Sequence, residues 1–214
     1  MKILEKLKRL FMVIEKNDNF YHECGHVIIS KIFEETLIVE FVTLELATTK
    51  MHDVESLGGL KAKFAIPVSN LSIYDHDKAI LSMLAGLCVD DINNNNGIIN
   101  SSFYEIQTWA NKFNEPRYEG DIELVISNFN AIKSTITLSW QEYISTSLKF
   151  LYGILNDNRI WETITVLRKH LKESTNHTLD NKQIDEIIIR TKFPKWVSQN
   201  KVTILKQRKN FLEN

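Results

Sequence analysis

The amino-acid sequence predicts a mainly α fold of the α+β class, in which helices surround a small β-sheet. Three observations predict it. Apolar residues recur at the three- and four-residue spacing of amphipathic helices over most of the chain. Two short stretches are instead rich in the β-branched and apolar residues that strands favour. No repeat and no long linker interrupts the 214 residues, and 43% hydrophobic content suffices for one sizeable core with room for an extra lobe.

The first predicted element is an amphipathic helix over residues 1–16. We expect its apolar stripe to pack against the rest of the protein, in preference to a membrane surface or a partner protein. Residues 17–190 follow as the main domain, and residues 191–214 form a basic C-terminal extension. The stripe consists of Ile3, Leu4, Leu7, Leu10, Phe11 and Ile14.

The main domain begins with a helix over about residues 19–33, and the polar residues 17–19 supply candidate N-caps. Residues 37–46 and 58–68 then predict two strands, with Pro67 marking a strand end or a sheet edge. The second strand is therefore expected at the border of the sheet.

A longer helix follows, with Asp75 or Asp77 as its N-cap and its end near residue 92. The polar residues 93–97 predict a loop. The remainder is expected to be helical, at residues 101–113, 119–135, 138–156, 159–173 and 181–190.

The C-terminal extension has an uneven charge. Seven basic and no acidic residues lie between Arg190 and Lys209, interleaved with apolar ones. We expect a packed terminal element with a solvated face, and binding of a partner subunit or a polyanion is the alternative. The formal net charge of the whole chain is −1, so nucleic acid is an unlikely partner.

The sequence H-E-C-G-H at residues 22–26 carries the strongest chemical signal. Residues four apart lie about 40° apart around a helix, so His22 and His26 can bind one metal ion from successive turns. Glu23 lies about 100° from His22, where a carboxylate can reach a metal-bound water without becoming a ligand. This spacing is typical of zinc hydrolases that use the H-E-x-x-H motif.

Two ordinary explanations compete with a metal site, namely a solvated histidine pair and a satisfied pair in the core. The apolar residues around the motif predict a mostly buried helix, in which two imidazoles and a carboxylate need partners, so they favour the metal. Cys24 lies about 200° from His22 and should face the core. The other histidines, His52, His76, His170 and His177, receive no catalytic role, and the last three are expected to be solvated.

The chain resembles the peptidase domain of FtsH-type ATP-dependent zinc proteases over about residues 17–190. Residues 21–27 read Y-H-E-C-G-H-V, where that family typically has Y-H-E-A-G-H-A. Residues 120–123 read G-D-I-E and are similar to the N-D-L-E segment of the family. Weaker similarities lie at residues 42–44, 57–60, 84–91, 158–159 and 178–184.

This resemblance implies a helical FtsH-like peptidase domain with Asp121 as the third ligand of a Zn²⁺ ion, beside His22 and His26. Three protein ligands leave a position for water, as catalytic zinc sites do. Glu23 would be the general base. A strand edge at Gly58, Gly59 and Leu60 would bind an extended peptide through main-chain hydrogen bonds, and an ordinary hairpin edge fits those three residues equally well.

The chain also departs from the family. It has no phosphate-binding G-x-x-x-x-G-K-S/T loop and no apolar run of the roughly 18 to 20 residues that span a bilayer. Polypeptide substrates would therefore be unfolded, short, or delivered by a separate unfoldase, and the family's rings make a homo-oligomer a further expectation. Leu87 replaces a frequent arginine, and Lys61 and Lys63 alter the edge strand. Two cysteines fit a reducing compartment, which favours a cytoplasmic location.

Three hypotheses follow from the sequence. The first is a zinc metalloendopeptidase that hydrolyses unfolded proteins or peptides. The second is a catalytically inactive, peptidase-like binding or regulatory module, which the missing ATPase and the altered strand residues motivate. The third and weakest is a phage or mobile-element protein that captures a host factor.

Overall fold

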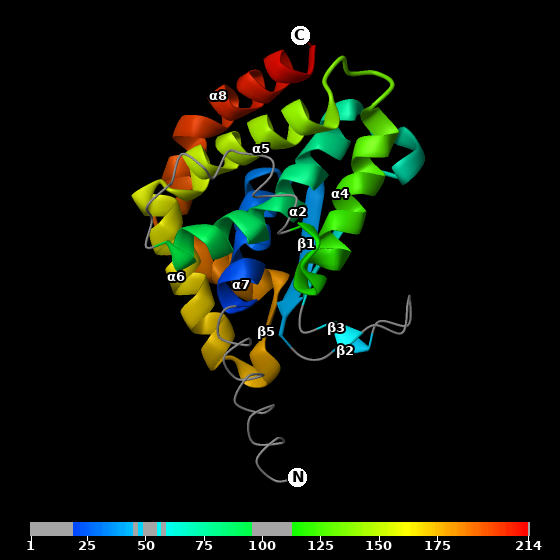
Figure 1. Ribbon diagram of the computed structural model, residues 1–214. Coiled ribbons are helices and arrows are strands. Elements are labelled where there is room, and N and C mark those ends of the chain that lie inside the picture. Colours follow the sequence, from blue (N-terminus) through cyan, green and yellow to red (C-terminus); the bar gives the residue numbers. More distant parts are fainter. Residues whose placement is uncertain (1–18, 45–46, 49–54, 57–58, 96–112, 214) are drawn as a thin grey trace, which may run out of the picture.

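The computed structural model describes residues 19–44, 47–48, 55–56, 59–95 and 113–213. Within these residues, helices surround a three-stranded antiparallel sheet, which confirms the predicted mainly α architecture with a small sheet (Figure 1). The helix expected over residues 1–16 and the segment 101–112 lie outside this part of the chain. None of the described helices combines the length and the apolar character needed to cross a membrane.

The sheet is built around β1 (Leu37–Thr43), which pairs antiparallel with β4 (Gly59–Phe64) and with β5 (Thr178–Asp180). The strand order β4-β1-β5 places β4 at an edge. Both strands predicted from the sequence therefore exist, although each is shorter than predicted, and β5 was not predicted. A separate two-stranded sheet joins β2 (Ala47–Thr48) to β3 (Glu55–Ser56).

The H-E-C-G-H motif lies on a helix over residues 19–32, here called the histidine helix and drawn in blue in Figure 1. This helix packs closely on α2 (Ile73–Asn94). A Cβ atom at Gly25 would lie 2.8 Å from the carbonyl oxygen of Ala85 and 2.8 Å from a methyl group of Val89. Glycine at this position of the motif therefore permits the close approach of the two helices.

The N-terminus of α2 corrects one prediction. Its N-cap is Ser72, not Asp75 or Asp77. The Ser72 hydroxyl accepts a hydrogen bond from the Asp75 backbone N–H, while the Asp75 carboxylate accepts one from the Ser72 N–H, so the two residues form a capping box. Asp77 is buried instead and forms an ion pair with Arg208.

The helices predicted at residues 119–135, 138–156, 159–173 and 181–190 agree with the structure to within a few residues, whereas the helix over Phe193–Glu213 was not predicted as one. In Figure 1, α4 runs beside the central α2, while α5 and α6 lie on the opposite flank of α2. The helical elements are α4 (Glu119–Ile132), α5 (Trp140–Leu155), α6 (Asn158–Glu173), α7 (Asn181–Ile188) and α8 (Phe193–Glu213), with short 3-10 turns at Val68–Asn70, Pro116–Tyr118 and Thr175–His177.

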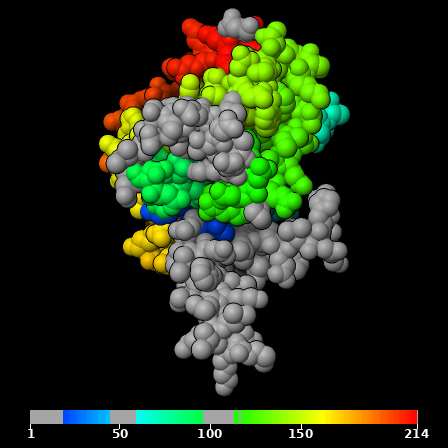
Figure 2. Space-filling view, viewed as in Figure 1, coloured from blue at the N-terminus to red at the C-terminus, as the bar shows by residue number. Residues whose placement is uncertain are grey.

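The basic C-terminal extension forms α8, which lies along α5 (Figures 1 and 2). Arg208 is buried in this interface, where its guanidinium donates to the Asp77 carboxylate and to the hydroxyl of Ser147. A buried ion pair contributes stability only when its geometry is good, and the second hydrogen bond helps to meet that condition. The extension is thus packed into the fold through a charged residue.

Asp157 provides a test of how α5 and α6 are joined. Its carboxylate caps α6 by accepting from the Arg159 N–H at 2.9 Å, and it also accepts from the Arg159 guanidinium and from the Trp196 side chain. These hydrogen bonds, that of Arg159 first, lower the pKa of Asp157 to about 2. We expect Asp157→Ala to lower the free energy of unfolding at pH 7 by about 1 kcal/mol, measured by urea denaturation.

The same cap predicts a pH dependence. A folded-state pKa below the unfolded value of about 3.9 gives stability that is present above about pH 4 and lost as the pH falls toward 2. The difference between wild type and Asp157→Ala should therefore shrink over that interval. Glu173→Ala, an exposed position at the opposite end of α6, is the matched control and should not be destabilising. Equal losses in both variants would contradict this account of the cap.

Candidate metal centre

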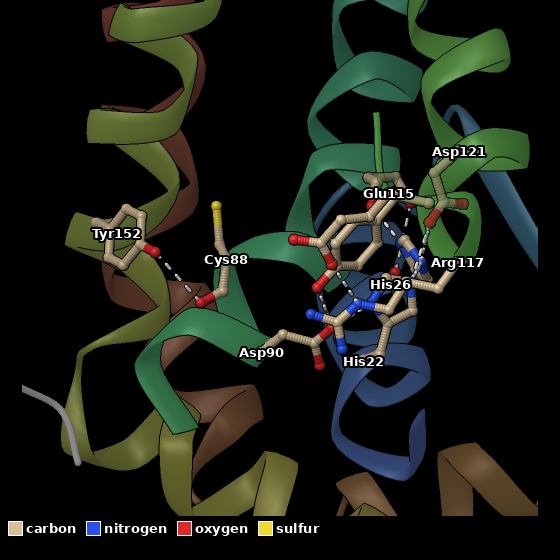
Figure 3. A network of polar contacts seen from close by, with 10 residues as sticks. His22, His26, Cys88, Asp90, Glu115, Arg117, Asp121 and Tyr152 are labelled. Carbon is tan, nitrogen blue, oxygen red and sulfur yellow. Dashed lines mark hydrogen bonds and ion pairs between the residues drawn. The ribbon is translucent and has the colours of Figure 1, made fainter. Parts of the chain in front are cut away.

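Three side chains that were predicted as metal ligands meet at one point (Figure 3). His22 and His26 come from successive turns of the histidine helix, and Asp121 comes from the first turn of α4. The two Nε2 atoms lie 2.9 Å apart, and the Asp121 Oδ2 lies 2.9 Å from the Nε2 of His22 and 3.3 Å from that of His26. The three donor atoms therefore converge.

The other nitrogen of each imidazole is already engaged. The His26 Nδ1 lies 2.7 Å from the backbone carbonyl oxygen of Ser82, and the His22 Nδ1 lies 3.0 Å from the Asp90 Oδ2. A carbonyl or carboxylate oxygen only accepts, so both Nδ1 atoms carry the proton and donate. In the neutral form each Nε2 then has a lone pair facing its neighbour and the Asp121 carboxylate.

Such a cluster requires a positive charge at its centre, supplied by a metal ion or by bound protons. Burial alone would lower the pKa of both histidines, but the Asp90 and Asp121 carboxylates raise the pKa of His22 well above its usual range, and Asp121 likewise raises that of His26. The nearby imidazoles, foremost His26, overcome the effect of burial and lower the pKa of Asp121. Protons and a metal ion would compete for the same three atoms.

The donor set fits a divalent zinc ion. Nitrogen and oxygen ligands about 2.0–2.1 Å from a tetrahedral zinc lie roughly 3.3 Å from one another, close to the separations found among these three atoms. Two histidines and one carboxylate also suit Fe²⁺, so the residues alone do not select the metal. Cys24 is buried in the core and does not belong to the cluster, as expected from its helix position.

Glu23 lies next to this cluster without being part of it. Its side chain is buried at 7% exposure, and its Oε2 atom has no hydrogen-bond partner among the described residues. Burial raises the pKa of this carboxyl group, although the neighbouring imidazoles of His26 and His22 oppose the shift. A buried carboxyl group with an unsatisfied oxygen beside a metal position is suited to accept and return a proton.

One face of α2 supports both histidines, and sequence analysis assigned it no role in the site. Ser82, Gly86 and Asp90 are four residues apart, so they share one face and run alongside His26 and His22. Ser82 holds His26, and Asp90 holds His22. Gly86 and Asp90, four residues apart on a buried helix, are the only residue types that could have signalled this face, because Ser82 contacts His26 through its backbone carbonyl.

Gly86 leaves the space that the centre needs. A Cβ atom at this position would lie 2.6 Å from the Nε2 atoms of both His22 and His26. Tyr118 is a second residue that sequence analysis missed. Its hydroxyl donates to the Asp90 Oδ2 at 3.0 Å, and burial, followed by the Asp90 charge, raises the pKa of the phenol. No spacing pattern in the sequence links Tyr118 to Asp90.

The predicted substrate-binding residues belong to the sheet edge. Gly59 and Leu60 lie at the start of β4, opposite Thr43 and Val42 of β1, while Gly58 lies outside the described residues. Leu60 is half-buried against the core. The side chains of Lys61 and Lys63, farther along this strand, are exposed and both pair with Glu40.

Two of the other histidines differ from expectation. His76 is half-buried and its Nδ1 hydrogen-bonds with Asn128, and the half-buried ring of His177 packs against Phe20. His170 is exposed, as expected, and His52 lies outside the described residues. The hydrogen bond of His76 identifies it as a structural residue, whereas the Nδ1 of His177 is buried without a hydrogen-bond partner among the described residues.

No protein-family model matches this chain, and neither the curated proteins nor the solved structures provide a match. The resemblance to the FtsH-type peptidase domain therefore stays a prediction based on motifs. The fold and the convergent side chains define a mainly helical protein with a candidate metal centre of two histidines and one aspartate.

The space beside Gly86 leads to a specific prediction. Gly86→Ala would place a methyl group against both Nε2 atoms, so we expect the bound metal per chain to fall well below that of the wild type. Elemental analysis of the purified protein measures this. Gly153→Ala is the matched control, because a Cβ atom at this helical glycine of α5 has no neighbour within 4 Å. Equal metal content in the two variants would show that Gly86 is not at the metal position.

Proposed function

We propose that this protein is a zinc-dependent metallopeptidase that hydrolyses peptide bonds in unfolded proteins or peptides. The observation that carries the proposal is the convergence of the His22 Nε2, the His26 Nε2 and the Asp121 Oδ2 while both Nδ1 atoms are engaged elsewhere. Three protein ligands leave an open position, which is the arrangement of catalytic zinc sites. The unsatisfied carboxyl oxygen of Glu23 supplies the group that moves the proton.

In this mechanism a bound Zn²⁺ would supply Lewis acidity, lowering the pKa of water and polarising the substrate carbonyl. Glu23 accepts the proton of the attacking water and returns it to the nitrogen of the leaving amine. Its burial keeps bulk water from competing for that proton. His22, His26 and Asp121 would hold the Zn²⁺ ion. Asp90 and the Ser82 carbonyl fix the orientation of the two imidazoles.

The position of β4 at the edge of the sheet favours a polypeptide as the substrate. β4 pairs with β1 on one side only within the described sheet, so its other side can accept an extended peptide through main-chain hydrogen bonds. Such binding requires little side-chain identity but does require an unfolded chain. Gly59 and Leu60 would begin this interaction, and the exposed Lys61 and Lys63 would influence which peptides bind.

Metal content provides the first test. We expect about one zinc per chain in the wild type after zinc reconstitution, and a loss or strong weakening of binding in Asp121→Ala, because one of three ligands is removed. Elemental analysis of both proteins side by side measures zinc and iron together. Iron in place of zinc would redirect the proposal to a different chemistry, and no metal in the reconstituted wild type would refute it.

Catalysis provides the second test. Glu23→Gln should retain zinc but reduce the cleavage rate of an unstructured protein such as casein by about 10²- to 10⁴-fold, because the amide cannot accept the proton. Glu119→Gln, on the helix that carries Asp121, is the matched control and should cleave like the wild type.

Full cleavage by zinc-loaded Glu23→Gln would refute the assigned mechanism. A zinc-loaded wild type that cleaves neither casein nor a varied set of peptides would favour a binding or regulatory module. Delivery by a separate unfoldase and self-association stay predictions, which addition of an unfoldase and size-exclusion chromatography would examine.

A further inference from the structure

Tyr118 contacts the ligand His22 and the carboxylate Asp90 that supports it. Its side chain is 1% exposed, and its hydroxyl donates to the Asp90 Oδ2 at 3.0 Å. The same Asp90 oxygen accepts from the His22 Nδ1 at 3.0 Å. The Tyr118 ring also stacks on the His22 ring, with 5.6 Å between centroids and 26° between planes. Tyr118 therefore contacts His22 directly and again through Asp90.

The position of Tyr118 in the chain adds a second constraint. It is the N-cap residue of α4, yet its side chain makes no capping hydrogen bond. Serine, threonine, aspartate or asparagine usually occupies this position, because their short side chains cap the helix. Here the side chain of Tyr118 is directed to Asp90 instead. Tyr118 itself lies three residues before Asp121 in the sequence. Tyr118 thus connects the start of α4 to Asp90, the carboxylate that binds the His22 imidazole.

Arg117 packs against the ring of Tyr118, and Figure 3 shows Arg117 close to Glu115 and His22. Its guanidinium carbon lies 4.4 Å from the centroid of the Tyr118 ring, and its Nε donates to Glu115 at 2.9 Å. The stacked guanidinium shields one face of the phenol, and the Glu115 contact holds it there. The hydrogen bond between Tyr118 and Asp90 is therefore protected from solvent competition.

We infer that Tyr118 is a positioning residue that sets the metal affinity of the centre by fixing the Asp90 carboxylate that orients His22 and by holding the start of α4, which carries Asp121. The inference rests on the metal site of the proposed function and is independent of peptide cleavage. Partners behind the ligands typically change metal affinity by about 10- to 100-fold, because they fix the imidazole tautomer and ring orientation.

The test compares two conservative variants of the full-length chain. Tyr118→Phe removes only the hydroxyl and should weaken Zn²⁺ binding about 10- to 100-fold, measured by competition with a chromophoric chelator. Tyr143→Phe is the matched control, since Tyr143 is also buried and donates to an aspartate, Asp77, outside the centre. Tyr143→Phe should lower the unfolding midpoint of the metal-free protein while leaving Zn²⁺ affinity unchanged.

A double-mutant cycle tests whether the hydroxyl acts through Asp90. In an Asp90→Ala background the hydroxyl has lost its acceptor, so Tyr118→Phe should cause no further loss of affinity. The visible absorption of the Co²⁺-substituted protein gives an independent readout, because it reports ligand geometry. We expect a changed spectrum in Tyr118→Phe and the wild-type spectrum in Tyr143→Phe.

The possible outcomes separate the two claims. A wild type that binds no metal refutes the proposed metal centre and this inference with it. If Tyr118→Phe binds Zn²⁺ as tightly as the wild type, the positioning role of Tyr118 is overturned while the proposed metal centre stands. Equal weakening in Tyr118→Phe and Tyr143→Phe, or a full additional loss in the Asp90→Ala background, also overturns it, because the effect would then be general packing or independent of Asp90.

Discussion

The lone pairs of two buried imidazoles and the charge of one carboxylate face each other, and this unfavourable convergence is the constraint on which the rest of the structure depends. Apart from a positive charge at its centre, such a cluster has no means of compensating for desolvation. The convergence persists because Asp90 and the Ser82 carbonyl accept hydrogen bonds from the two Nδ1–H groups, which keeps both rings from rotating away. The three donor atoms are thus held in a fixed arrangement before any cation is present.

Preparing these donors requires close contact between helices that are distant in the sequence. The histidine helix approaches α2 at Gly25, and α2 presents Gly86 to both imidazoles, so two glycines without side chains bring the backbones together. Asp90 lies 68 residues from His22, and Asp121 lies 99 residues from it. Packing of the apolar faces of these helices brings Asp90 and Asp121 close to His22. The hydrophobic core around the polar site therefore holds its geometry.

These separations explain which parts of the site could be predicted from the sequence. The four-residue spacing of His22 and His26 is local, so helix geometry alone predicted a shared ligand position. Asp121 was found only through a resemblance, since no local pattern connects it to the histidines. Tyr118 was missed because its contact with Asp90 depends on how α4 starts beside α2. The N-cap of α2 was misassigned because Ser72 and Asp75 are both good capping residues, and only their reciprocal hydrogen bonds distinguish them.

Glu23 bears on the difference between a centre that only stabilises the fold and one that performs chemistry. A buried oxygen without a hydrogen-bond partner costs about 1–3 kcal/mol, and Glu23 Oε2 is such an atom among the described residues. A centre used only for stability would gain from replacing Glu23 with an apolar residue of similar size. Keeping a carboxylate there is reasonable when it must exchange a proton with a water at the open position, so this unsatisfied oxygen favours turnover over a purely structural metal.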